Sequence, residues 1–268
     1  MPRTGSTNAD LAGRARDGEA PGLVIVTDDQ VAGRGRLARE WIAPPRSSIT
    51  VSVLVAPSAP PERWGWLSLL AGVAVVRVLI RLAGLPAVLK WPNDVLVPVP
   101  GSELEHHKVC GILAEAVQGR DGRRSVVIGT GVNVSQEQDE LPVPEATSLR
   151  LAGAATTDRD VLLRAYLRHL ADDLRRWDDA AGDPRRSGLG AAYREACTTI
   201  GRRVTVHLPG PARLTGVCEG VDDDGRLLVR DDTGTDHVLA AGDVVHVRPD
   251  AGEGRPDAGE GRPEVPVP

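Results

Sequence analysis

A change of pattern at Gly201 limits the folds that the chain can adopt. Before it, β-branched runs alternate with segments of helical period, whereas after it five short strand-like runs are separated by turn sequences such as "DDDG" and "DDTGT". So many short strands in so few residues favour a small closed β-barrel. For a chain of 268 residues, we predict an α+β domain with a mixed β-sheet and flanking helices over residues 1–198 and a small β-barrel domain over residues 199–249.

The expected elements follow from hydrophobic period and turn residues. In the first domain, strands are expected at 23–28, 47–57, 87–91, 108–117 and 125–134, and helices at 8–18, 64–82, 160–179 and 191–201. The barrel strands are expected at 202–209, 212–221, 226–231, 236–242 and 244–249. Residues 250–268 contain a direct duplication, "DAGEGRP", without apolar period, which predicts a disordered tail.

The most apolar segment, 64–82, is predicted to be a buried helix. Arg77 and Arg81 interrupt it, so its uncharged part is too short to span a bilayer. The N-terminal "MPRTGSTNAD" has no apolar run, so we expect no signal peptide. The segment pattern therefore predicts a protein without a membrane partner.

Charge and cysteine content exclude two further classes. The net charge of −5 argues against a general nucleic-acid binder with a basic surface. Cys110, Cys197 and Cys218 lie far apart without a CxxC pair, which indicates reduced thiols in a cytoplasmic protein rather than a disulfide framework or a zinc site.

Three polar residues, Ser6, Thr7 and Asn8, stand before a helical pattern. One of them would serve as the N-cap, because Ser, Thr and Asn are all favoured there. A cap needs one such side chain rather than three, so the others could bind a polar, uncharged ligand group. The segment alone favours the cap.

The stretch "DDQVAGRGRLAREW", residues 28–41, combines glycines that let a backbone approach a ligand, basic side chains that can bind anionic oxygens, and one aromatic ring. These residues are Gly33, Gly35, Arg34, Arg36, Arg39 and Trp41. A solvated basic loop is one interpretation, and RNA binding is another that a single short Gly/Arg run supports weakly. We expect a basic loop that closes over a small anion.

Of the 32 basic residues, only Lys90 and Lys108 are lysines. Lysine carries a compact charge on a flexible stem, whereas arginine presents a planar fork, so the two replace each other poorly where geometry matters. Lys90 precedes the turn "WPND" and Lys108 begins a strand, and either could be an ordinary loop lysine. The strong bias toward arginine instead indicates that lysine is needed at both positions.

The segment "IGTGVNV" ends the strand at 125–134 with two glycines and Asn133. It could mark a close backbone crossing, with Asn133 as a turn residue, or a surface where a flat ligand lies against bare backbone. The loop "SELEHHK" carries acids and histidines but has the composition of a solvated loop, so we predict no metal site formed by protein ligands.

Taken in order, Ser6-Thr7-Asn8, Gln30 with "GRGRLAREW", "KWPND", "KVCGIL" and "GTGVNV" resemble the biotin protein ligases (biotin–[acetyl-CoA-carboxylase] ligases). The resemblance covers about residues 5–248. It implies a catalytic domain of the class II aminoacyl-tRNA synthetase type followed by an SH3-like barrel. It also implies that biotin and ATP form biotinyl-5′-AMP, and that the biotinyl group then passes to a lysine of a biotin carboxyl carrier protein domain of an acyl-CoA carboxylase.

The resemblance further implies roles for individual residues. The catalytic residues would be Lys108, Arg36 and Arg34. Biotin would be bound by Ser6, Thr7, Asn8, Gln30, Gly33, Arg34, Gly35, Arg36 and Lys108. ATP would be bound by Arg39, Trp41, Lys90, Asn93, Asp94 and Asn133. Mg²⁺ would be held mainly through the ATP phosphates rather than by a protein ligand set. Such roles fit the chemistry, since a carboxylate and a phosphate repel each other unless cations lie between them.

Two other functions remain open: a lipoate or octanoyl protein ligase, and a non-catalytic biotin-sensing module. The "GRGR" loop, "KWPND" and the barrel favour biotin, and the full set of anion-binding residues favours catalysis. Ligases that double as repressors carry an N-terminal helix-turn-helix domain, and nothing precedes "RTGSTN", so we expect no DNA binding.

Overall fold

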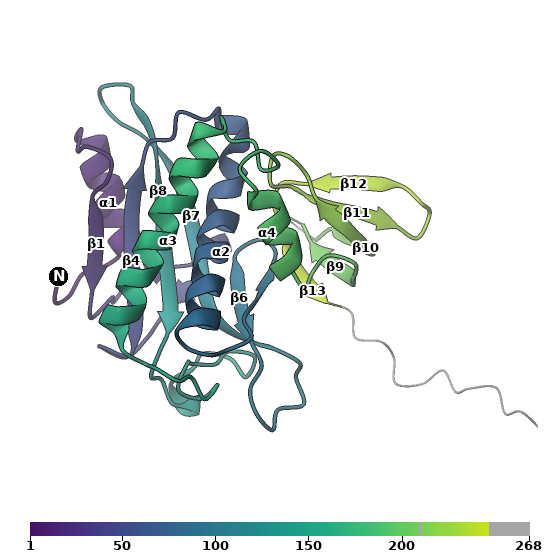
Figure 1. Ribbon diagram of the computed structural model, residues 1–268, viewed down its shortest axis with the longest axis horizontal. Helices are drawn as coiled ribbons and strands as arrows, with labels where there is room; N and C mark the ends of the chain where they lie inside the picture. The colour runs from purple at the N-terminus through teal and green to yellow at the C-terminus, as the bar shows by residue number, and fades with distance from the viewer. Residues whose placement is uncertain (209–210, 247–268) are drawn as a thin grey trace, which may run out of the picture.

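The computed structural model describes residues 1–208 and 211–246 (Figure 1). Its centre is a six-stranded sheet in the order β1-β4-β8-β7-β6-β5. These strands are β1 (Val24–Thr27), β4 (Ser48–Val55), β8 (Arg124–Asn133), β7 (His107–Gln118), β6 (Asp94–Val97) and β5 (Val88–Lys90). Every neighbouring pair in this sheet is antiparallel. Among the described residues, parallel pairing is confined to isolated bridges such as Leu89 with Cys197.

Helices cover the two faces of the sheet unequally. The helices are α1 (Thr7–Arg16), α2 (Trp66–Arg81), α3 (Arg159–Asp179) and α4 (Leu189–Ala196). Because side chains alternate along a strand, Val53 of β4 packs in the core with α2 and α3, whereas the next residue, Leu54, packs with α1. Helix α1 covers part of its face near β1, β4 and β8. The rest of that face is available for a ligand site.

Helix α2 forms the centre of the core. By length and composition the stretch Pro61–Arg81 could cross a membrane, contrary to our expectation from its two arginines, but 67% of its apolar window is buried inside the fold. Arg77 reaches the buried carboxylate of Asp173 in α3, with Nη1 2.5 Å from Oδ2. The helix ends at Arg81, one residue before the end of the predicted segment 64–82.

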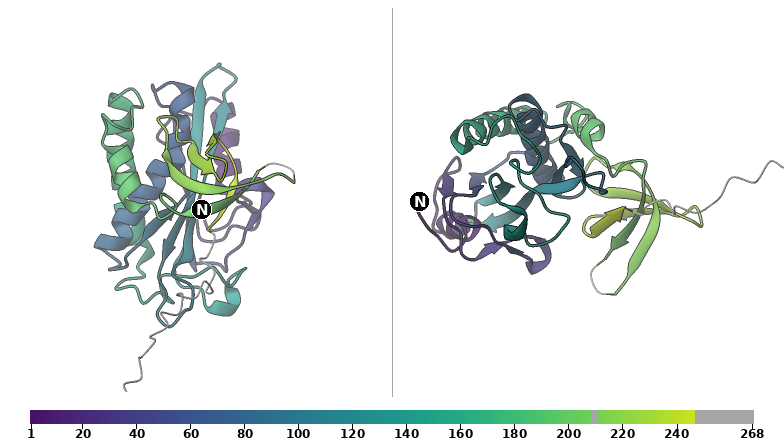
Figure 2. Two further views of the ribbon diagram at one scale, coloured as in Figure 1. Left: turned by 90° about the vertical axis from the view of Figure 1, so that its right-hand side faces the viewer. Right: turned by 90° about the horizontal axis from the view of Figure 1, so that it is seen from below.

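A second antiparallel sheet follows in the order β12-β11-β10-β9-β13. Its strands are β9 (Arg203–His207), β10 (Arg213–Val221), β11 (Leu227–Asp231), β12 (Asp236–Leu239) and β13 (Asp243–His246). Within the described residues β12 and β13 do not pair, so the barrel stays open at that seam. It lies beside the β5–β6 edge of the large sheet (Figures 1 and 2).

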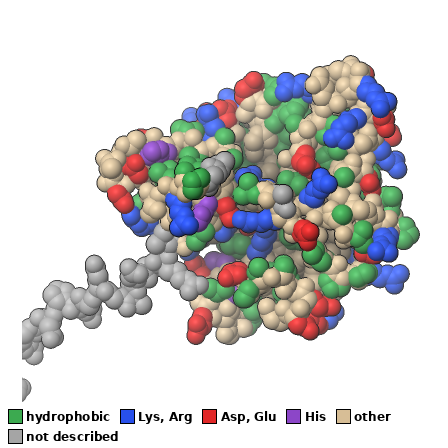
Figure 3. All heavy atoms as spheres, turned by 180° about the vertical axis from the view of Figure 1, so that it is seen from behind, with side chains coloured by type: hydrophobic (Ala, Val, Ile, Leu, Met, Phe, Trp, Pro, Cys, Tyr) green, Lys and Arg blue, Asp and Glu red, His purple; other side chains and the backbone are tan. Residues whose placement is uncertain are grey.

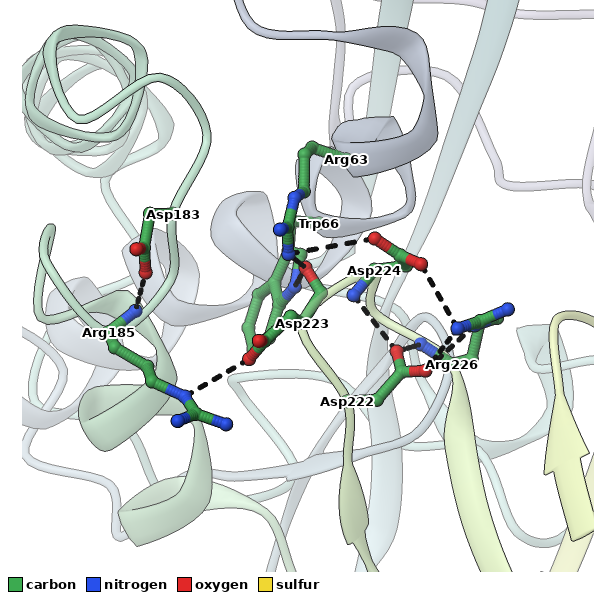
Figure 4. Close-up of polar contacts among 8 residues, drawn as sticks. All are labelled: Arg63, Trp66, Asp183, Arg185, Asp222, Asp223, Asp224 and Arg226. Atoms are coloured by element: carbon green, nitrogen blue, oxygen red, sulfur yellow. Dashed lines mark hydrogen bonds and ion pairs between the residues drawn. The ribbon is translucent and has the colours of Figure 1, made fainter.

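The β10–β11 turn attaches this barrel to the first domain (Figure 4). The indole nitrogen of Trp66 donates to the backbone oxygen of Asp223 at 3.0 Å, and that of Trp91 donates to the backbone oxygen of Gly225 at 3.1 Å. Arg185 pairs with the Asp223 carboxylate at 3.2 Å. Neutral donors in a buried setting are thus matched to carbonyls that would otherwise lack partners.

Two glycines make this attachment close. A Cβ atom on Gly65 would lie 2.3 Å from the backbone oxygen of Asp224, and one on Gly225 would lie 2.8 Å from the carbonyl carbon of Gly65. Gly225 also has φ +83°, which disfavours other residues. Backbone therefore packs directly on backbone where the two domains meet.

The predicted α+β fold with a C-terminal barrel is confirmed. The structure adds β6 and a small hairpin of β2 (Gly33–Arg34) with β3 (Glu40–Trp41), which the sequence pattern did not reveal. Within residues 1–208 and 211–246, three 3-10 turns complete the elements: η1 (Arg36–Ala38), η2 (Pro61–Gly65) and η3 (Gln138–Glu140). Helix α4 begins and ends earlier than the predicted 191–201. The domain boundary between 198 and 199 stays a prediction, and residues 247–249 and the tail 250–268 lie outside the described residues.

Candidate active site

The floor of the site is bare backbone on the middle strands. Gly129 and Gly131 in β8 and Gly111 in β7 alternate with core residues such as Ile128 and Ile112, so they face the side of the sheet that carries α1. A Cβ on Gly131 would lie 2.5 Å from the Trp41 ring, and one on Gly111 would lie 2.9 Å from it. The indole of Trp41 therefore packs directly against this strip.

A cavity of about 450 Å³ stands over the floor. Its walls come from the start of α1, the segment 30–42, the β5–β6 turn, a loop at 142–146 and the start of β13 in the barrel. Figure 3 shows a hollow near the middle of this face, with Lys and Arg side chains gathered in and around it. Both domains thus contribute to one enclosure.

The cavity brings together almost all of the residues predicted from the sequence. Those lining it are Ser6, Thr7, Asn8, Gln30, Arg34, Gly35, Arg36, Arg39, Trp41, Lys90, Asn93, Asp94, Lys108 and Asn133. Gly33 lies behind this lining and pairs with Trp41 between β2 and β3. A Cβ there would lie 2.3 Å from Nε2 of Gln30, so Gly33 allows a close approach within the wall. The ligand roles of all these residues stay predictions.

One end of the cavity is polar and uncharged. Ser6 caps α1, its hydroxyl accepting from the Ala9 nitrogen at 3.4 Å, so the predicted cap is present. Thr7 and Asn8 in the first turn are left for other partners. The hydroxyl of Ser52 lies 2.7 Å from Oγ1 of Thr7 and 2.6 Å from Oδ1 of Asn8. Gln30 accepts from the Thr7 nitrogen at 2.9 Å. The polar cluster that the sequence suggested is therefore both a cap and a network.

The other end is cationic. The basic residues of the lining are Arg34, Arg36, Arg39, Lys90 and Lys108, against the acidic residues Glu40, Asp94 and Asp243. Lys108 pairs with Asp94 and stands 5.9 Å from the centre of the Trp41 ring. Burial lowers the pKa of Arg36, while the charges of Asp94 and Asp243 oppose that shift. Partly desolvated cations of this kind attract anions more strongly than exposed ones.

The β5–β6 turn is held at several polar atoms. The Trp91 nitrogen donates to Oγ1 of Thr199 at 3.1 Å, and the hydroxyl of Ser68 donates to the Pro92 oxygen at 3.0 Å. The Asn93 amide donates to the Ile112 oxygen at 3.0 Å. The turn is flanked by Lys90 and Asp94, which are directly paired in register and face the cavity. These hydrogen bonds fix the turn in "KWPND" and so fix the positions from which Lys90 and Asp94 extend into the cavity.

Asn133, at the end of β8, is already engaged. Its amide nitrogen donates to the Thr147 oxygen at 2.9 Å, and its amide oxygen accepts from Nε2 of Gln136 at 3.1 Å. It lines the cavity all the same. These contacts fix its orientation and leave the oxygen one further lone pair for a ligand donor.

Sequence reasoning missed the contribution of the barrel. Gly242, Asp243, Val244 and Val245 line the cavity, and Asp243 forms an ion pair with Arg39. Side-chain hydrogen bonding to Asp243 raises the pKa of Arg39. No local pattern in "AAGDVVHV" marks the aspartate, because its importance depends on a contact 204 residues away along the chain. The place of Gly111 in the floor could have been predicted from the sequence. In a strand it faces the side opposite to its apolar neighbours Cys110 and Ile112.

Among the described residues, no group of three or more His, Cys, Asp or Glu side chains is arranged to hold a metal ion. Asp94 is a carboxylate of the cavity that faces the cationic end. The cysteines are buried and free, and burial raises the pKa of Cys110 above its usual range. Cys110 is therefore not suited to act as a nucleophile. The side chains that line the cavity instead suit the binding of two anions beside a neutral polar group.

Comparison with known families and proteins gives a consistent picture. Residues 1–133 match the Biotin/lipoate A/B protein ligase family, and residues 199–247 match the Biotin protein ligase C terminal domain. The Biotin--[acetyl-CoA-carboxylase] ligase of Mycobacterium tuberculosis is 43% identical over 253 residues, covering 92% of this chain and 88% of that protein. The Bifunctional ligase/repressor BirA of Bacillus subtilis is 31% identical over 230 residues, covering 85% of this chain and 67% of that protein.

A solved structure agrees with these matches. The biotin protein ligase from Aquifex aeolicus in complex with biotin and ATP superposes with a TM-score of 0.72 at 25% identity. The superposition covers 93% of this chain and 97% of that chain. It therefore includes both the large sheet and the barrel.

Proposed function

The chain belongs to the biotin protein ligase family, and from this we propose that it activates biotin with ATP and transfers it to a lysine of a biotin carboxyl carrier protein domain of an acyl-CoA carboxylase. The observation that carries the proposal is the cavity itself. It joins a neutral network around Thr7, Asn8 and Gln30 to a cationic end around Arg36 and Lys108. The polar groups of biotin are distributed in the same way, with a neutral ureido ring at one end and a carboxylate at the other.

The first step brings together the biotin carboxylate and the α-phosphate of ATP. An oxygen of the carboxylate attacks the α-phosphorus, and pyrophosphate leaves, giving biotinyl-5′-AMP. Lys108 and Arg36 lie at the cationic end and would reduce the repulsion between these two anions, with Arg34 beside them. A lysine ammonium can follow oxygens that rearrange, which a rigid fork does less well.

The second step is acyl transfer. The neutral amine of the acceptor lysine attacks the carbonyl carbon of the mixed anhydride, AMP leaves with the bonding electrons, and the nitrogen of the new amide loses a proton to solvent. The loop bearing Gly35 and Arg36 closes one wall of the cavity and would keep water from the anhydride until the acceptor arrives. Another wall, at the start of β13, belongs to the barrel.

ATP would lie on the side of the cavity opposite the neutral network. Trp41 offers a ring for the adenine, and Asn93 and Asn133 offer amide groups for its edge. Arg39 and Lys90 would bind phosphate oxygens. Mg²⁺ bound with ATP would neutralise phosphate charge, and Asp94, one of the three carboxylates of the lining, would lie on the side of the metal or the phosphates.

We further place this enzyme in the cytoplasm, where its carboxylase partner would be found. Support comes from three cysteines that are all free and buried. The repressor activity in the names of some relatives is not extended to this chain, and its net charge of −5 gives no reason to propose a DNA partner.

Two alternatives predict different ligands. A lipoate ligase would present the neutral network to a dithiolane ring, which has no donors or acceptors to match it, so the buried polar groups would be left without partners. A sensing module without catalysis would not require a cationic pair between two anions. The polar network of Thr7, Asn8 and Gln30 therefore favours biotin.

The test is ATP–pyrophosphate exchange by the purified full chain with Mg²⁺, comparing biotin, lipoate and no acid. We expect exchange that depends on biotin, followed by label transfer to an added biotin carboxyl carrier domain. Exchange supported by lipoate instead would move the chain to the rival activity. Binding of biotin without any exchange would indicate the sensing module.

A further inference from the structure

We propose that Glu115, which does not line the cavity, is a positioning residue that fixes the amide of Asn8 so that its oxygen is offered to the ligand. This inference rests on the proposed function and concerns how the neutral end of the site reads its ligand. Glu115 lies on β7 and is exposed, whereas Asn8 is 7% exposed and lines the cavity. The contact joins residues 107 positions apart.

Both hydrogens of the Asn8 amide nitrogen are bound by the protein. Nδ2 donates to Oε2 of Glu115 at 2.7 Å and to the backbone oxygen of Leu113 at 3.2 Å. Its Oδ1 atom lies 2.6 Å from the hydroxyl of Ser52. The polar capacity that Asn8 still has for a ligand is the second lone pair of Oδ1, which makes it an acceptor.

Glu115 strengthens the preference of the Asn8 amide for one orientation, which the Leu113 oxygen also favours. A carboxylate can only accept hydrogen bonds, so it selects the orientation with Nδ2 toward it and Oδ1 away from it. The bond to Glu115 is shorter than the one to Leu113 and is assisted by charge, so it is the stronger of the two. Ser52, by contrast, can donate or accept and would tolerate either orientation.

Gln30 is oriented in the opposite sense. Its Oε1 accepts from the nitrogen of Thr7 at 2.9 Å and from the Thr7 hydroxyl at 3.2 Å. A backbone N–H can only donate, so Oε1 is fixed toward Thr7. Among the residues that the structure describes, none accepts from Nε2 of Gln30. This Nε2 atom lies against Gly33, where a Cβ would be 2.3 Å away, so Gln30 keeps an unpaired donor at the wall of the cavity.

The two amides together form a pattern of one acceptor and one donor. An N–H group adjacent to a C=O group is its complement, and a cyclic urea carries both. Donor–acceptor patterns of this kind reject ligands that lack the matching groups, because the protein groups would be left unpaired in a buried site. Glu115 thus acts on specificity through Asn8, without contacting the ligand.

Two substitutions separate this role from a general effect on folding. Glu115→Lys replaces an acceptor by a donor, which should attract Oδ1 of Asn8 and turn Nδ2 toward the ligand N–H. Glu115→Gln keeps an acceptor oxygen, and with the acceptor-only Leu113 oxygen unchanged it should preserve the orientation. Glu195→Lys makes the same charge reversal at an exposed position of α4 and is the matched control.

The measurements are the Kd for biotin by calorimetry without ATP, and the KM for ATP in biotin-dependent pyrophosphate exchange. We expect Glu115→Lys to raise the biotin Kd by about tenfold, because the Leu113 oxygen still holds part of the orientation. The KM for ATP should stay within about twofold, and Glu115→Gln and Glu195→Lys should bind biotin like the original chain.

Unchanged biotin affinity in Glu115→Lys would overturn the inference, as would an equal loss in Glu115→Gln or in Glu195→Lys. These outcomes are distinct from failure of the proposed function, since that failure would appear in the unsubstituted chain as the absence of biotin-dependent exchange.

Discussion

The Nζ atom of Lys108 lies 2.6 Å from Oδ1 of Asp94, across the β6–β7 pair and within the wall of the cavity. The carboxylate holds the ammonium at the cationic end before any anion binds. The aliphatic part of the Lys108 side chain passes over Gly111, where a Cβ would lie 3.4 Å from the Cε atom of Lys108. The stem of Lys108 therefore packs against the bare backbone at Gly111.

From this relationship we expect Lys108→Ala to lower kcat/KM for pyrophosphate exchange by about 10²–10³, the typical effect of removing one charge-stabilising group. Lys108→Arg keeps the charge but replaces a compact head by a planar fork, so we expect it to lose at least about tenfold. Exchange assays on both variants provide the measurement, with circular dichroism as the check on folding. An arginine variant as active as the original would show that charge alone suffices.

Gly131 offers a test of the bare floor. A methyl group at this position would lie 2.5 Å from Cε2 of Trp41, so in Gly131→Ala the indole must move. Since Trp41 belongs to the short strand β3, we expect the strain to be relieved by displacing the segment around it rather than by unfolding. The predicted result is an increase of about tenfold in the KM for ATP, because an overpacking cost of ~1–3 kcal/mol acts where the ring should stack.

Gly13→Ala is the control for the Gly131 substitution. Gly13 lies within α1, and no heavy atom lies within 4 Å of a Cβ placed there. Alanine has the higher helix propensity, so this variant should gain about 0.5–1 kcal/mol in the free energy of unfolding and keep its KM for ATP. Equal KM values in both glycine variants would contradict the role given to the floor.

Much of this site follows from short segments of the sequence because each segment carries its own signal. Ser6, Thr7 and Asn8 stand together at a helix start, and Lys108 stands out from a chain rich in arginine. Each is visible within a few residues. The cavity confirms that these segments meet, although which ligand atoms they contact stays a prediction.

What could not be predicted depends on contacts between distant positions. Glu115 sits on an exposed stretch of strand, and its value becomes visible only through its bond to Asn8. Trp91 lies in the segment "KWPND", and its indole nitrogen donates to a backbone oxygen 134 residues away along the chain. The Trp91 contact depends on how the barrel docks, and the Glu115 contact depends on how α1 packs against the sheet. No local period or turn signal encodes either arrangement.

The joint between the domains gives a prediction on stability. Gly225→Ala would combine an unfavourable φ of +83° with a Cβ only 2.8 Å from the Gly65 carbonyl carbon. Gly234→Ala shares the φ of +83° but meets no heavy atom within 4 Å. The left-handed conformation should cost each variant about 1–2 kcal/mol. Overpacking should lower the free energy of unfolding of Gly225→Ala by a further ~1–3 kcal/mol, the range seen for overpacked cores.

Urea denaturation followed by tryptophan fluorescence is the suitable measurement for this pair, since Trp66 and Trp91 both donate to the turn that contains Gly225. If the contact between the two domains is weakened, Gly225→Ala should also lose activity at urea concentrations where Gly234→Ala is still active. If the two variants unfold together, the close packing at Gly65 contributes nothing measurable to stability.

The partly buried position of His246 leads us to predict that the free energy of unfolding depends on pH. Its Nε2 atom lies 3.2 Å from the hydroxyl of Thr199. Burial is the main cause that lowers the pKa of His246 to about 4, and the charges of Lys90, Arg202 and His106 add to the shift while that of Glu105 opposes it. The unfolded chain, with a His pKa near 6.5, therefore binds this proton at a higher pH than the folded chain does.

The free energy of unfolding should then be fully retained above about pH 6.5 and should fall as the pH drops from there toward about 4, because protons favour the unfolded chain in that window. His246→Gln removes the titrating group and should flatten this part of the curve, while leaving the curve between pH 7 and 8 unchanged in slope. Thermal unfolding at intervals across both windows measures the two slopes. Since burial also lowers the pKa of His106, part of the slope will remain in the variant. A variant whose slope between pH 6.5 and 4 equals that of the original chain would mean that the His246 ring takes up its proton equally well in the folded and unfolded states.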